Sequence, residues 1–527
     1  MKLRTKVIAY LSVLLLAACA PEDQASNSDV IAGPDYNITY DLLISGGTIV
    51  DGTGDPAFMA DILVSGDEID YIGETDASNI NALETIDATG RIVSPGFIDA
   101  HAHGDPLQEN NDHLRSFLRQ GVTTVMLGQD GGNPGYDDAV SFEDFLYEID
   151  RQKSGPNVAT LVGHGAIRYL SGGGEKDKIT PEEQAAMEEL LEKAMKAGAY
   201  GLGTGLEYVP GRYADDEEMF GLAKVVGAHD GVISSHVRNE DDDKVHESIA
   251  ELIRQGHYAR VNASHVKVVY GKTREQGEAV LRQIREARAN GVKITADVYP
   301  YLASFGDMSY LYPEWAKREF EFNDAVAKRR AEFKEFLTAK IKRRNGPGAI
   351  LVSSGEYSGK TVAEISEITG KDPEDIIMDY GHNGPSTAHF IMTKETQDAF
   401  ITAEDVSIST DGSPTMRHPR SFGSFPKVLY EYVVRDKVMS LELAINKMTG
   451  QTADIFDIQT RGRLKEGMAA DIVVMDLENV RPGTDWTDVY AEPTGFDAVI
   501  VNGMITDTTA GSDSRVNGRI LRKTKGD

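Results

Sequence analysis

PGFIDAHAHGD, at residues 95–105, is the segment that decides the fold of this chain. Its apolar pair Phe97 and Ile98 ends a predicted β-strand, and His101 and His103 follow two residues apart. Because alternate residues of an extended chain share a face, both imidazoles can reach one metal ion. Two histidines alone are weak support for a metal site, so the interpretation depends on the rest of the chain.

From this segment to about residue 463, short β-branched runs alternate with helical stretches. The alternation predicts a parallel sheet covered by helices, and a number of strand runs near eight favours a (β/α)₈ barrel of the TIM type. An open doubly wound sheet is the alternative. Such a sheet needs a glycine-rich phosphate loop after its first strand, and this sequence has no Gly-X-Gly-X-X-Gly there.

Three later runs also close on residues that can bind a metal or move a proton. VISSH ends at His236, VNASH ends at His265 and VSISTD ends at Asp411. In TIM-type barrels the catalytic groups lie at the C-terminal ends of the strands. The sequence therefore predicts that these three residues meet His101 and His103 at one end of the barrel.

Both ends of the chain are rich in short strands and turns. Four such runs are YDLLISGGTIV (40–50), ADILVSGDEIDY (60–71), ADIVVM (470–475) and DAVIV (497–501). They predict a small composite β-sandwich domain from residues 37–94 and 464–520, beside a barrel domain at 95–463. Residues 302–346 are charged and lack strand runs, which indicates a helical insertion near the barrel mouth and a candidate lid.

The composition is that of a globular protein with an acidic surface. The chain has 527 residues, 40% of them hydrophobic, with a formal net charge of −30 and a pI near 4.8. Such a surface repels phosphate backbones, which argues against nucleic acid as a partner.

The N-terminus has the parts of a secretion signal. Lys2, Arg4 and Lys6 precede an apolar run at residues 7–16 that is too short to span a bilayer. LAAC follows at residues 16–19 and resembles the lipobox of bacterial lipoproteins, in which the signal is removed before a cysteine that carries lipid. Cys19 is the only cysteine in the chain, so no disulfide framework is possible.

The lipobox resemblance implies a signal peptide at 1–18 and a lipid on Cys19 that attaches the protein to a membrane. Residues 19–36 are polar and aperiodic, which predicts a flexible tether. We therefore expect a lipid-anchored protein of a bacterial cell envelope, facing the periplasm. Ala20, rather than Asp, follows the cysteine, which favours the outer membrane.

The barrel motifs together resemble the amidohydrolase superfamily, and within it the N-acyl-D-amino-acid deacylases, or D-aminoacylases. The resemblance covers roughly residues 41–506. Besides the first segment, the strings that carry it are QGVTTVMLGQDGG (120–132), GHGAIR (163–168), GLEYVPGRYA (205–214), SSHVRNE (234–240), ASHVKV (263–268), ADVYPY (296–301), STDGSP (409–414), HPRSFGSFP (418–426) and RGRLKEGMAADIVVMD (461–476).

The resemblance implies that His101, His103, His236 and His265 bind one or two ions of zinc or another divalent metal. It also implies that Asp411 is the general base and a further candidate ligand. Such an ion lowers the pKa of bound water toward ~7 and polarises the scissile carbonyl.

One position departs from the resembled deacylases, which commonly carry a zinc-binding cysteine in a Gly-Asn-Cys-Gly turn. Here the turn is Gly128-Gln129-Asp130-Gly131, so we predict Asp130 as a ligand in place of the thiolate. A carboxylate is a harder ligand than a thiolate, which leaves the identity of the metal open. No lysine lies at residues 200–205, which argues against a carbamylated lysine that bridges two ions there.

Four residues are candidates for binding the carboxylate of an N-acyl amino acid. Lys267 lies two residues beyond His265, Tyr299 lies in ADVYPY, and Arg417 and Arg420 follow Asp411. Arg and Lys suit a carboxylate, although such side chains are more often simply solvated. The resemblance favours the binding role for Lys267 and Arg420 more than for Arg417.

The predicted reaction is hydrolysis of an N-acyl-D-amino acid to a carboxylate and a free D-amino acid. Hydrolysis of a cyclic amide, as in dihydroorotase or hydantoinase relatives, and cleavage of a dipeptide are the enzymatic alternatives. A third alternative is an inactive lipoprotein that binds metal or solute. The presence of every ligand type together with Asp411 argues against it.

Overall fold

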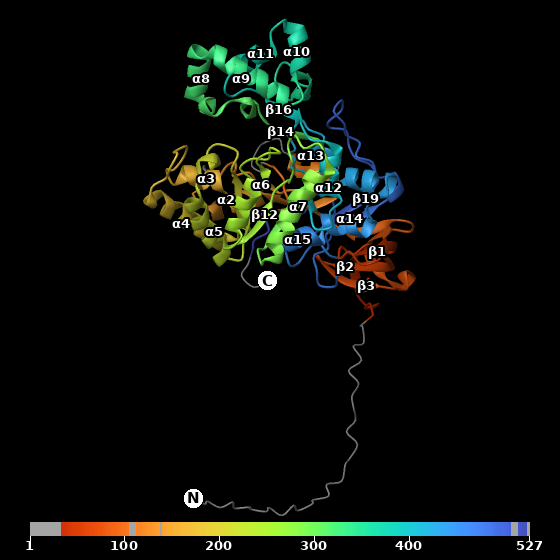
Figure 1. The fold of residues 1–527 in the computed structure, drawn as a ribbon. Helices are drawn as coiled ribbons and strands as arrows, with labels where there is room; N and C mark the ends of the chain where they lie inside the picture. The colour runs from red at the N-terminus through yellow and green to blue at the C-terminus, as the bar shows by residue number, and fades with distance from the viewer. Residues whose placement is uncertain (1–32, 105–111, 137–139, 507, 509–514, 524–527) are drawn as a thin grey trace, which may run out of the picture.

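The computed structural model describes residues 33–104, 112–136, 140–506, 508 and 515–523 (Figure 1). The predicted signal peptide at 1–18, Cys19 and most of the predicted tether at 19–36 lie outside these residues. No helix in the part of the chain that the structure describes is both long and apolar enough to cross a membrane.

Short parallel strands form the centre of the described chain. They are β6 (Phe97–Asp99), β7 (Val122–Leu127), β8 (Asn157–Thr160), β9 (Val162–Gly163), β10 (Gly201–Gly205), β11 (Val232–His236), β12 (Arg260–Ala263), β13 (Ile294–Val298) and β17 (Ser407–Ile408). They make two hydrogen-bonded sheets, β6-β7-β8 and β17-β13-β12-β11-β10-β9. Because only Leu161 separates β8 from β9, these described strands occupy eight positions.

Backbone contacts at both edges join the two sheets into a closed barrel. At one edge the amide of Asp411 donates to the carbonyl of His101 at 2.8 Å, and the amide of His103 donates to that of Gly412 at 2.7 Å. At the other edge β8 continues into β9, where Leu161 donates to Leu127 at 2.9 Å. An open sheet has no such closing contacts, so the predicted barrel is confirmed.

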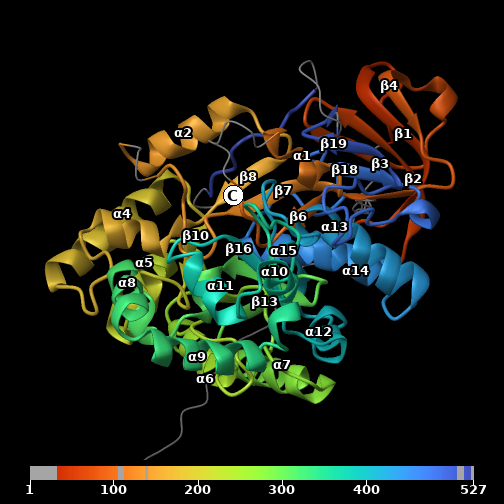
Figure 2. The ribbon, with the colours of Figure 1, turned by 90° about the horizontal axis from the view of Figure 1, so that it is seen from above.

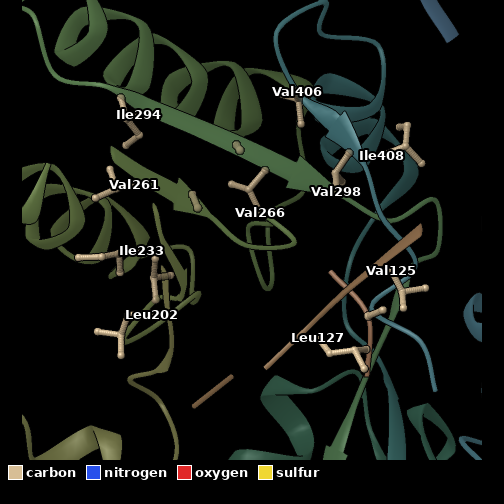
Figure 3. Close-up of a cluster of buried hydrophobic side chains, with 14 of the residues drawn as sticks. Val125, Leu127, Leu202, Ile233, Val261, Val266, Ile294, Val298, Val406 and Ile408 are labelled. Atoms are coloured by element: carbon tan, nitrogen blue, oxygen red, sulfur yellow. The ribbon is translucent and has the colours of Figure 1, made fainter. Parts of the chain in front are cut away.

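The alternation of side chains along the barrel strands separates an apolar face from a polar one. Val261 and Ala263 of β12 join one buried cluster with the surrounding helices, which include α4 (Pro181–Ala197), α5 (Asp216–Ala228), α6 (Val245–Gln255) and α7 (Arg274–Ala289) (Figures 2 and 3). Between them in sequence, Asn262 donates to Asp297 of β13 at 2.7 Å. The polar face therefore lines the barrel interior, at the side where the candidate site residues lie.

Strands from both chain ends form a second sheet beside the barrel (Figure 1). They are β1 (Thr39–Ile49), β2 (Phe58–Ser65), β3 (Glu68–Gly73), β4 (Asn81–Asp87), β5 (Ile92–Pro95), β18 (Ile472–Met475), β19 (Phe496–Val501) and β20 (Met504–Ile505). The register of β1 against β2 shifts between Ile44 and Gly47. At that shift the other edge of β1 changes partner from β4 to β5, so the sheet branches there.

The C-terminal boundary of this domain differs from the prediction of 464–520. The sheet ends with β20. The described residues 515–523 pass from this domain, where Arg515 pairs with Glu84 at 3.1 Å, to the barrel. There Val158 of β8 donates to Arg519 at 2.9 Å and accepts from Leu521 at 2.7 Å. The last segment is therefore an extended strip paired with a barrel strand, whose few residues give no strand pattern of their own.

The insertion is longer than the predicted range of 302–346, and it is not all helical. It contains β14 (Ala303–Asp307), α8 (Glu319–Lys328), α9 (Arg330–Arg343), β15 (Ile350–Val352), α10 (Val362–Thr369), α11 (Pro373–Asp379) and β16 (Ser386–Phe390). β16 pairs antiparallel with β14 and with β15, so the end of the insertion lies beside its beginning. The difference arises because these short strands become regular only through pairing between distant parts of the sequence. Figure 1 shows the helices above the barrel mouth, over a buried core of their own.

Candidate metal centre and active site

Six predicted site residues meet at the C-terminal ends of the barrel strands. His101 and His103 follow β6, Asp130 follows β7, His236 ends β11, His265 follows β12 and Asp411 follows β17. Three of them, Asp130, His265 and Asp411, have positive φ angles of 53°, 35° and 50°. Non-glycine residues rarely adopt this left-handed backbone, and where they do the strained positions cluster at functional sites.

Asp130 lies in the middle of the four histidines. Its Oδ1 is 3.4 Å from Nε2 of His101 and 3.6 Å from Nε2 of His265. Its Oδ2 is 3.5 Å from Nε2 of His103 and 3.9 Å from Nδ1 of His236. One carboxylate thus faces all four imidazoles, so Asp130 would belong to any set of ligands that they form for a divalent cation.

The chemistry of this cluster fits a divalent cation. Ligand atoms of His101, Asp130, His265 and Asp411 all lie within 4.8 Å of one another. Oδ1 of Asp130 is buried and has no hydrogen-bond partner among the described residues, and an unpaired buried carboxylate oxygen is costly unless a cation satisfies it. Imidazole nitrogens together with carboxylate oxygens suit zinc, and also manganese or cobalt.

Charge within the site is distributed between the imidazoles and the carboxylates. Burial opposes the charged form of His103, but the hydrogen bonds that its imidazolium donates to the carboxylates of Asp130 and Asp411 outweigh burial and raise the pKa of His103 to about 9. Burial also opposes ionisation of Asp411. Arg420 at 2.7 Å, followed by His265, outweighs burial and lowers the Asp411 pKa, so that carboxyl group is ionised.

Three acidic or phenolic residues that the sequence analysis did not select hold the ligands in place. Glu240 accepts from Lys267 at 2.6 Å, and the same Lys267 Nζ lies 2.8 Å from Nδ1 of His265. On the other side of the site, Tyr208 Oη lies 2.8 Å from Nδ1 of His236, and Glu207 lies 3.0 Å from its Nε2. All three occur in the motifs GLEYVPGRYA and SSHVRNE, so the sequence contained a signal for them.

A cavity of about 440 Å³ opens over the ligands, and three of the four predicted carboxylate-binding residues line it. The Lys267 ammonium lies 5.5 Å from the ring centre of Tyr299, and the Arg420 guanidinium lies 4.8 Å from it. The Tyr299 hydroxyl is buried and has no partner among the described residues. Two cations and a free phenolic donor therefore converge on one part of the cavity wall.

Arg417 does not reach this cavity. It is half-buried on the loop after Asp411, and its guanidinium lies against the insertion loop at Gly359. The structure therefore brings together the other nine predicted barrel residues, and it places Arg417 outside the group. Its role in binding substrate stays a prediction that the geometry does not favour.

Comparison with known proteins places the chain in the amidohydrolase family, whose model matches residues 92–520. The chain is 32% identical to the N-acyl-D-glutamate deacylase of Alcaligenes xylosoxydans xylosoxydans, over 92% of this chain and 96% of that protein. It is 30% identical to the D-aminoacylase of the same organism, over 92% and 98%. The chain belongs to the amidohydrolase family.

A solved structure shares both the fold and the sequence similarity. It is the N-acyl-D-glutamate deacylase of Bordetella bronchiseptica, complexed with zinc and with a phosphonate inhibitor that mimics the tetrahedral intermediate. The TM-score is 0.78 at 30% identity, and the match covers 92% of this chain and 100% of that one. The chain is thus a metal-dependent amidohydrolase that acts on C–N bonds other than peptide bonds, similar to the N-acyl-D-amino-acid deacylases. Neither the site nor these relatives support the alternative of an inactive binding protein.

Proposed function

We propose that this enzyme hydrolyses N-acyl-D-amino acids to a carboxylate and a free D-amino acid. The observation that carries the proposal is the position of Lys267, Tyr299 and Arg420 in the same cavity as the metal ligands. An N-acyl amino acid has an amide and a carboxylate separated by one carbon, so it needs these two sites side by side. The named relatives, which act on N-acyl-D-amino acids, support the same choice.

His101, His103, Asp130, His236 and His265 would hold one or two divalent ions. Zinc is the first candidate, because the relative from Bordetella bronchiseptica is complexed with it. A bound ion of this kind makes a water acidic and polarises an amide carbonyl. Asp411, at the cavity wall, takes the proton of the attacking water and returns it to the departing amine. Arg420 fixes the Asp411 carboxylate through their 2.7 Å ion pair.

Lys267, Tyr299 and Arg420 orient the substrate through its α-carboxylate. The Lys267 and Arg420 cations supply charge, and the unpartnered Tyr299 hydroxyl supplies a directed donor. Binding at this fixed point presents one face of the amide to the ligands and sets which configuration at the α-carbon is accepted. We infer that the D configuration is accepted.

A paired-substrate assay tests this proposal. N-acetyl-D- and N-acetyl-L-amino acids, dihydroorotate, hydantoin and a dipeptide are incubated with the metal-loaded enzyme, and released amine or ring-opened product is measured. We expect free D-amino acid from the D-series and little product from the other compounds. Ring opening or dipeptide cleavage without deacylation would replace the proposal with one of its two enzymatic alternatives.

We further propose that a lipid on Cys19 holds the enzyme at the outer membrane, facing the periplasm. The support is the basic and apolar leader, the LAAC sequence, and Ala20 after the cysteine. Bacterial lipoproteins carry several acyl chains, enough for stable attachment, whereas one chain gives only marginal binding. The wild-type protein should label with radioactive palmitate and sediment with membranes. Unchanged processing and membrane retention of Cys19→Ser would contradict the lipid anchor.

A further inference from the structure

A buried histidine lies between the Asp411–Arg420 ion pair and the start of the insertion. His418 is fully buried, in the loop that leads from Asp411 to α13 (Arg420–Lys427). Its Nδ1 lies 3.0 Å from the backbone nitrogen of Arg420, and its Nε2 lies 3.1 Å from the carbonyl oxygen of Ala303, the first residue of β14. One imidazole thus links α13 to a segment that is 115 residues from His418 in the sequence.

The two partners determine which nitrogen of the His418 ring carries the proton. The backbone N–H of Arg420 can only donate, so Nδ1 must accept with its lone pair. The carbonyl of Ala303 can only accept, so the proton must be on Nε2. Burial, followed by the nearby Arg420 guanidinium, lowers the pKa of His418 well below its usual range, which favours the same neutral ring. Both hydrogen bonds therefore require one tautomer of the uncharged imidazole.

The hydrogen bond to Nδ1 fixes the first residue of α13. The first N–H groups of a helix have no partner within the helix, and the side chain of Pro419, which precedes α13, makes no capping bond. His418 supplies the missing acceptor for the Arg420 N–H. The buried guanidinium of Arg420 lies 2.7 Å from the Asp411 carboxylate and 4.8 Å from the ring centre of Tyr299. Because this side chain extends from the residue that His418 fixes, the Nδ1 bond helps to set where the guanidinium lies.

The hydrogen bond from Nε2 fixes part of the cavity wall. β14 begins at Ala303, and the next four residues, Ser304–Asp307, all line the cavity. Ala303 also pairs with Phe390, the last residue of β16, at the other end of the insertion. The Nε2 bond thus holds the insertion at the point where its two ends meet.

The imidazole of His418 is enclosed by aromatic rings. Its ring centre lies 4.5 Å from that of Trp486, which belongs to the segment between β18 and β19. The rings of Tyr301 and Phe305 lie 5.6 and 6.1 Å from it, and Trp486 also lies 4.7 Å from Phe390. When a hydrogen bond is removed in such a dry setting, water does not replace it and the partner is left unsatisfied. Loss of either bond should therefore displace the segment that the bond holds.

We propose that His418 is a positioning residue, which acts on the reaction through Arg420 and β14 and does not itself contact the substrate. Its Nδ1 keeps the Arg420 guanidinium against the Asp411 carboxylate, and its Nε2 keeps the cavity wall in place beside them. This inference rests on the proposed deacylase function, in which Asp411 is the general base. The two ring nitrogens have different tasks, so their effects on turnover and on substrate affinity can be separated.

Two substitutions remove the two bonds one at a time. The side-chain oxygen of His418→Asn takes the place of Nδ1, so this variant keeps the acceptor for Arg420 and loses the donor to Ala303. The amide group of His418→Gln reaches the place of Nε2, so this variant keeps the donor and loses the acceptor. Both variants are assayed, metal-loaded, with N-acetyl-D-amino acids.

The variants should divide the effect between kcat and KM. His418→Gln should lower kcat by about 10- to 100-fold, because small displacements of catalytic groups have effects of this size. His418→Asn should keep kcat close to the wild-type value and raise KM by about three- to tenfold, the value of one hydrogen bond that holds the wall. An equal fall of kcat in the two variants, or no change in either, would overturn the proposal. If His418→Gln does not fold, His418→Phe fills the aromatic enclosure without either bond, and it should show the fall of kcat that His418→Asn lacks.

A double-mutant cycle determines whether His418 acts through Arg420. In an Arg420→Met background the guanidinium is absent, so adding His418→Gln should have little further effect on kcat. Two independent effects that simply multiply would contradict a positioning role.

His389→Gln is the matched control. His389 is equally buried, lies opposite Ser304 in the pairing of β14 with β16, and has its Nε2 2.9 Å from the Thr387 hydroxyl. The same substitution there should lower the melting temperature and leave kcat close to the wild-type value. A fall of kcat equal to that in His418→Gln would assign the effect to lost packing in general and refute the specific role of His418.

Failure of the deacylase proposal is a distinct outcome. If the wild type releases no D-amino acid, the proposed function fails, and the two bonds are tested by hydrogen–deuterium exchange of the metal-loaded protein, which needs no turnover. His418→Gln should speed exchange at the start of α13, and His418→Asn should speed exchange in β14. Exchange that matches the wild type at both segments in both variants would show that His418 positions neither.

Discussion

Asp411→Asn is expected to lower kcat by on the order of 10²-fold or more, because the substitution removes the general base. The amide keeps an oxygen where the carboxylate now lies, 3.2 Å from Nε2 of His103, so metal content should stay near the wild-type value. The substitution also removes the charge partner of Arg420, whose guanidinium is 2.7 Å away. Turnover is measured with N-acetyl-D-amino acids, and metal by elemental analysis of the same sample.

The two measurements together separate a catalytic role of Asp411 from a structural one. Loss of turnover with metal retained is the expected result. The melting temperature should fall, because a buried charge partner of Arg420 is lost, and an unchanged far-UV circular dichroism spectrum shows that the barrel is intact. Wild-type turnover in Asp411→Asn would remove Asp411 from the mechanism. Loss of metal in parallel with activity would make Asp411 primarily a ligand, since its carboxylate belongs to the same cluster as His101 and Asp130.

Asp130→Ala is expected to lose metal and at least about 100-fold in activity. Even groups that only orient metal ligands cost 10- to 100-fold when removed, and Asp130 lies within 3.4–3.9 Å of a nitrogen on each of the four histidines. Elemental analysis should show fewer ions per chain than in the wild type. His236→Ala and His265→Ala are the comparison variants, and they should lose metal as well.

Asp130→Cys tests the role of this position from the opposite direction. Because thiolate is a soft ligand that suits zinc, this variant should bind zinc but tolerate manganese or cobalt less well than the wild type. The alternative role for Asp130 is structural, as a turn residue between Gly128 and Gly131, all three with positive φ. A fully metallated and active Asp130→Ala enzyme would establish that structural role and leave the metal to the histidines.

Much of the active site was predictable because its residues follow rules of local geometry. His101 and His103 share a face by the two-residue period of extended chain, and His236, His265 and Asp411 lie at or just after strand ends, where this barrel type gathers its catalytic groups. Asp130 was predictable only from the resemblance, since an aspartate in a glycine-rich turn is by itself ordinary. The structure shows that its carboxylate points to all four imidazoles.

The rest of the site depends on contacts between distant parts of the chain. Arg344 and Lys317 belong to a charged insertion where most cations are solvated, and neither lies in a motif that marks it. Their position at the cavity depends on the pairing of β14 with β16, which holds the insertion over the barrel mouth. Arg417 is the opposite case: it lies close to Asp411 in sequence, but the loop turns its side chain toward Gly359.

The most direct test of the account is to measure D-amino-acid release against metal content. The purified enzyme is depleted with a chelator, reconstituted with increasing equivalents of zinc, and assayed with matched N-acetyl-D- and N-acetyl-L-amino acids. We predict negligible release without metal, release from the D-substrate that rises until one or two ions are bound per chain, and little release from the L-substrate. Undiminished release by the metal-free enzyme, or no release of any D-amino acid when the site is fully metallated, would contradict a metal-dependent N-acyl-D-amino-acid deacylase.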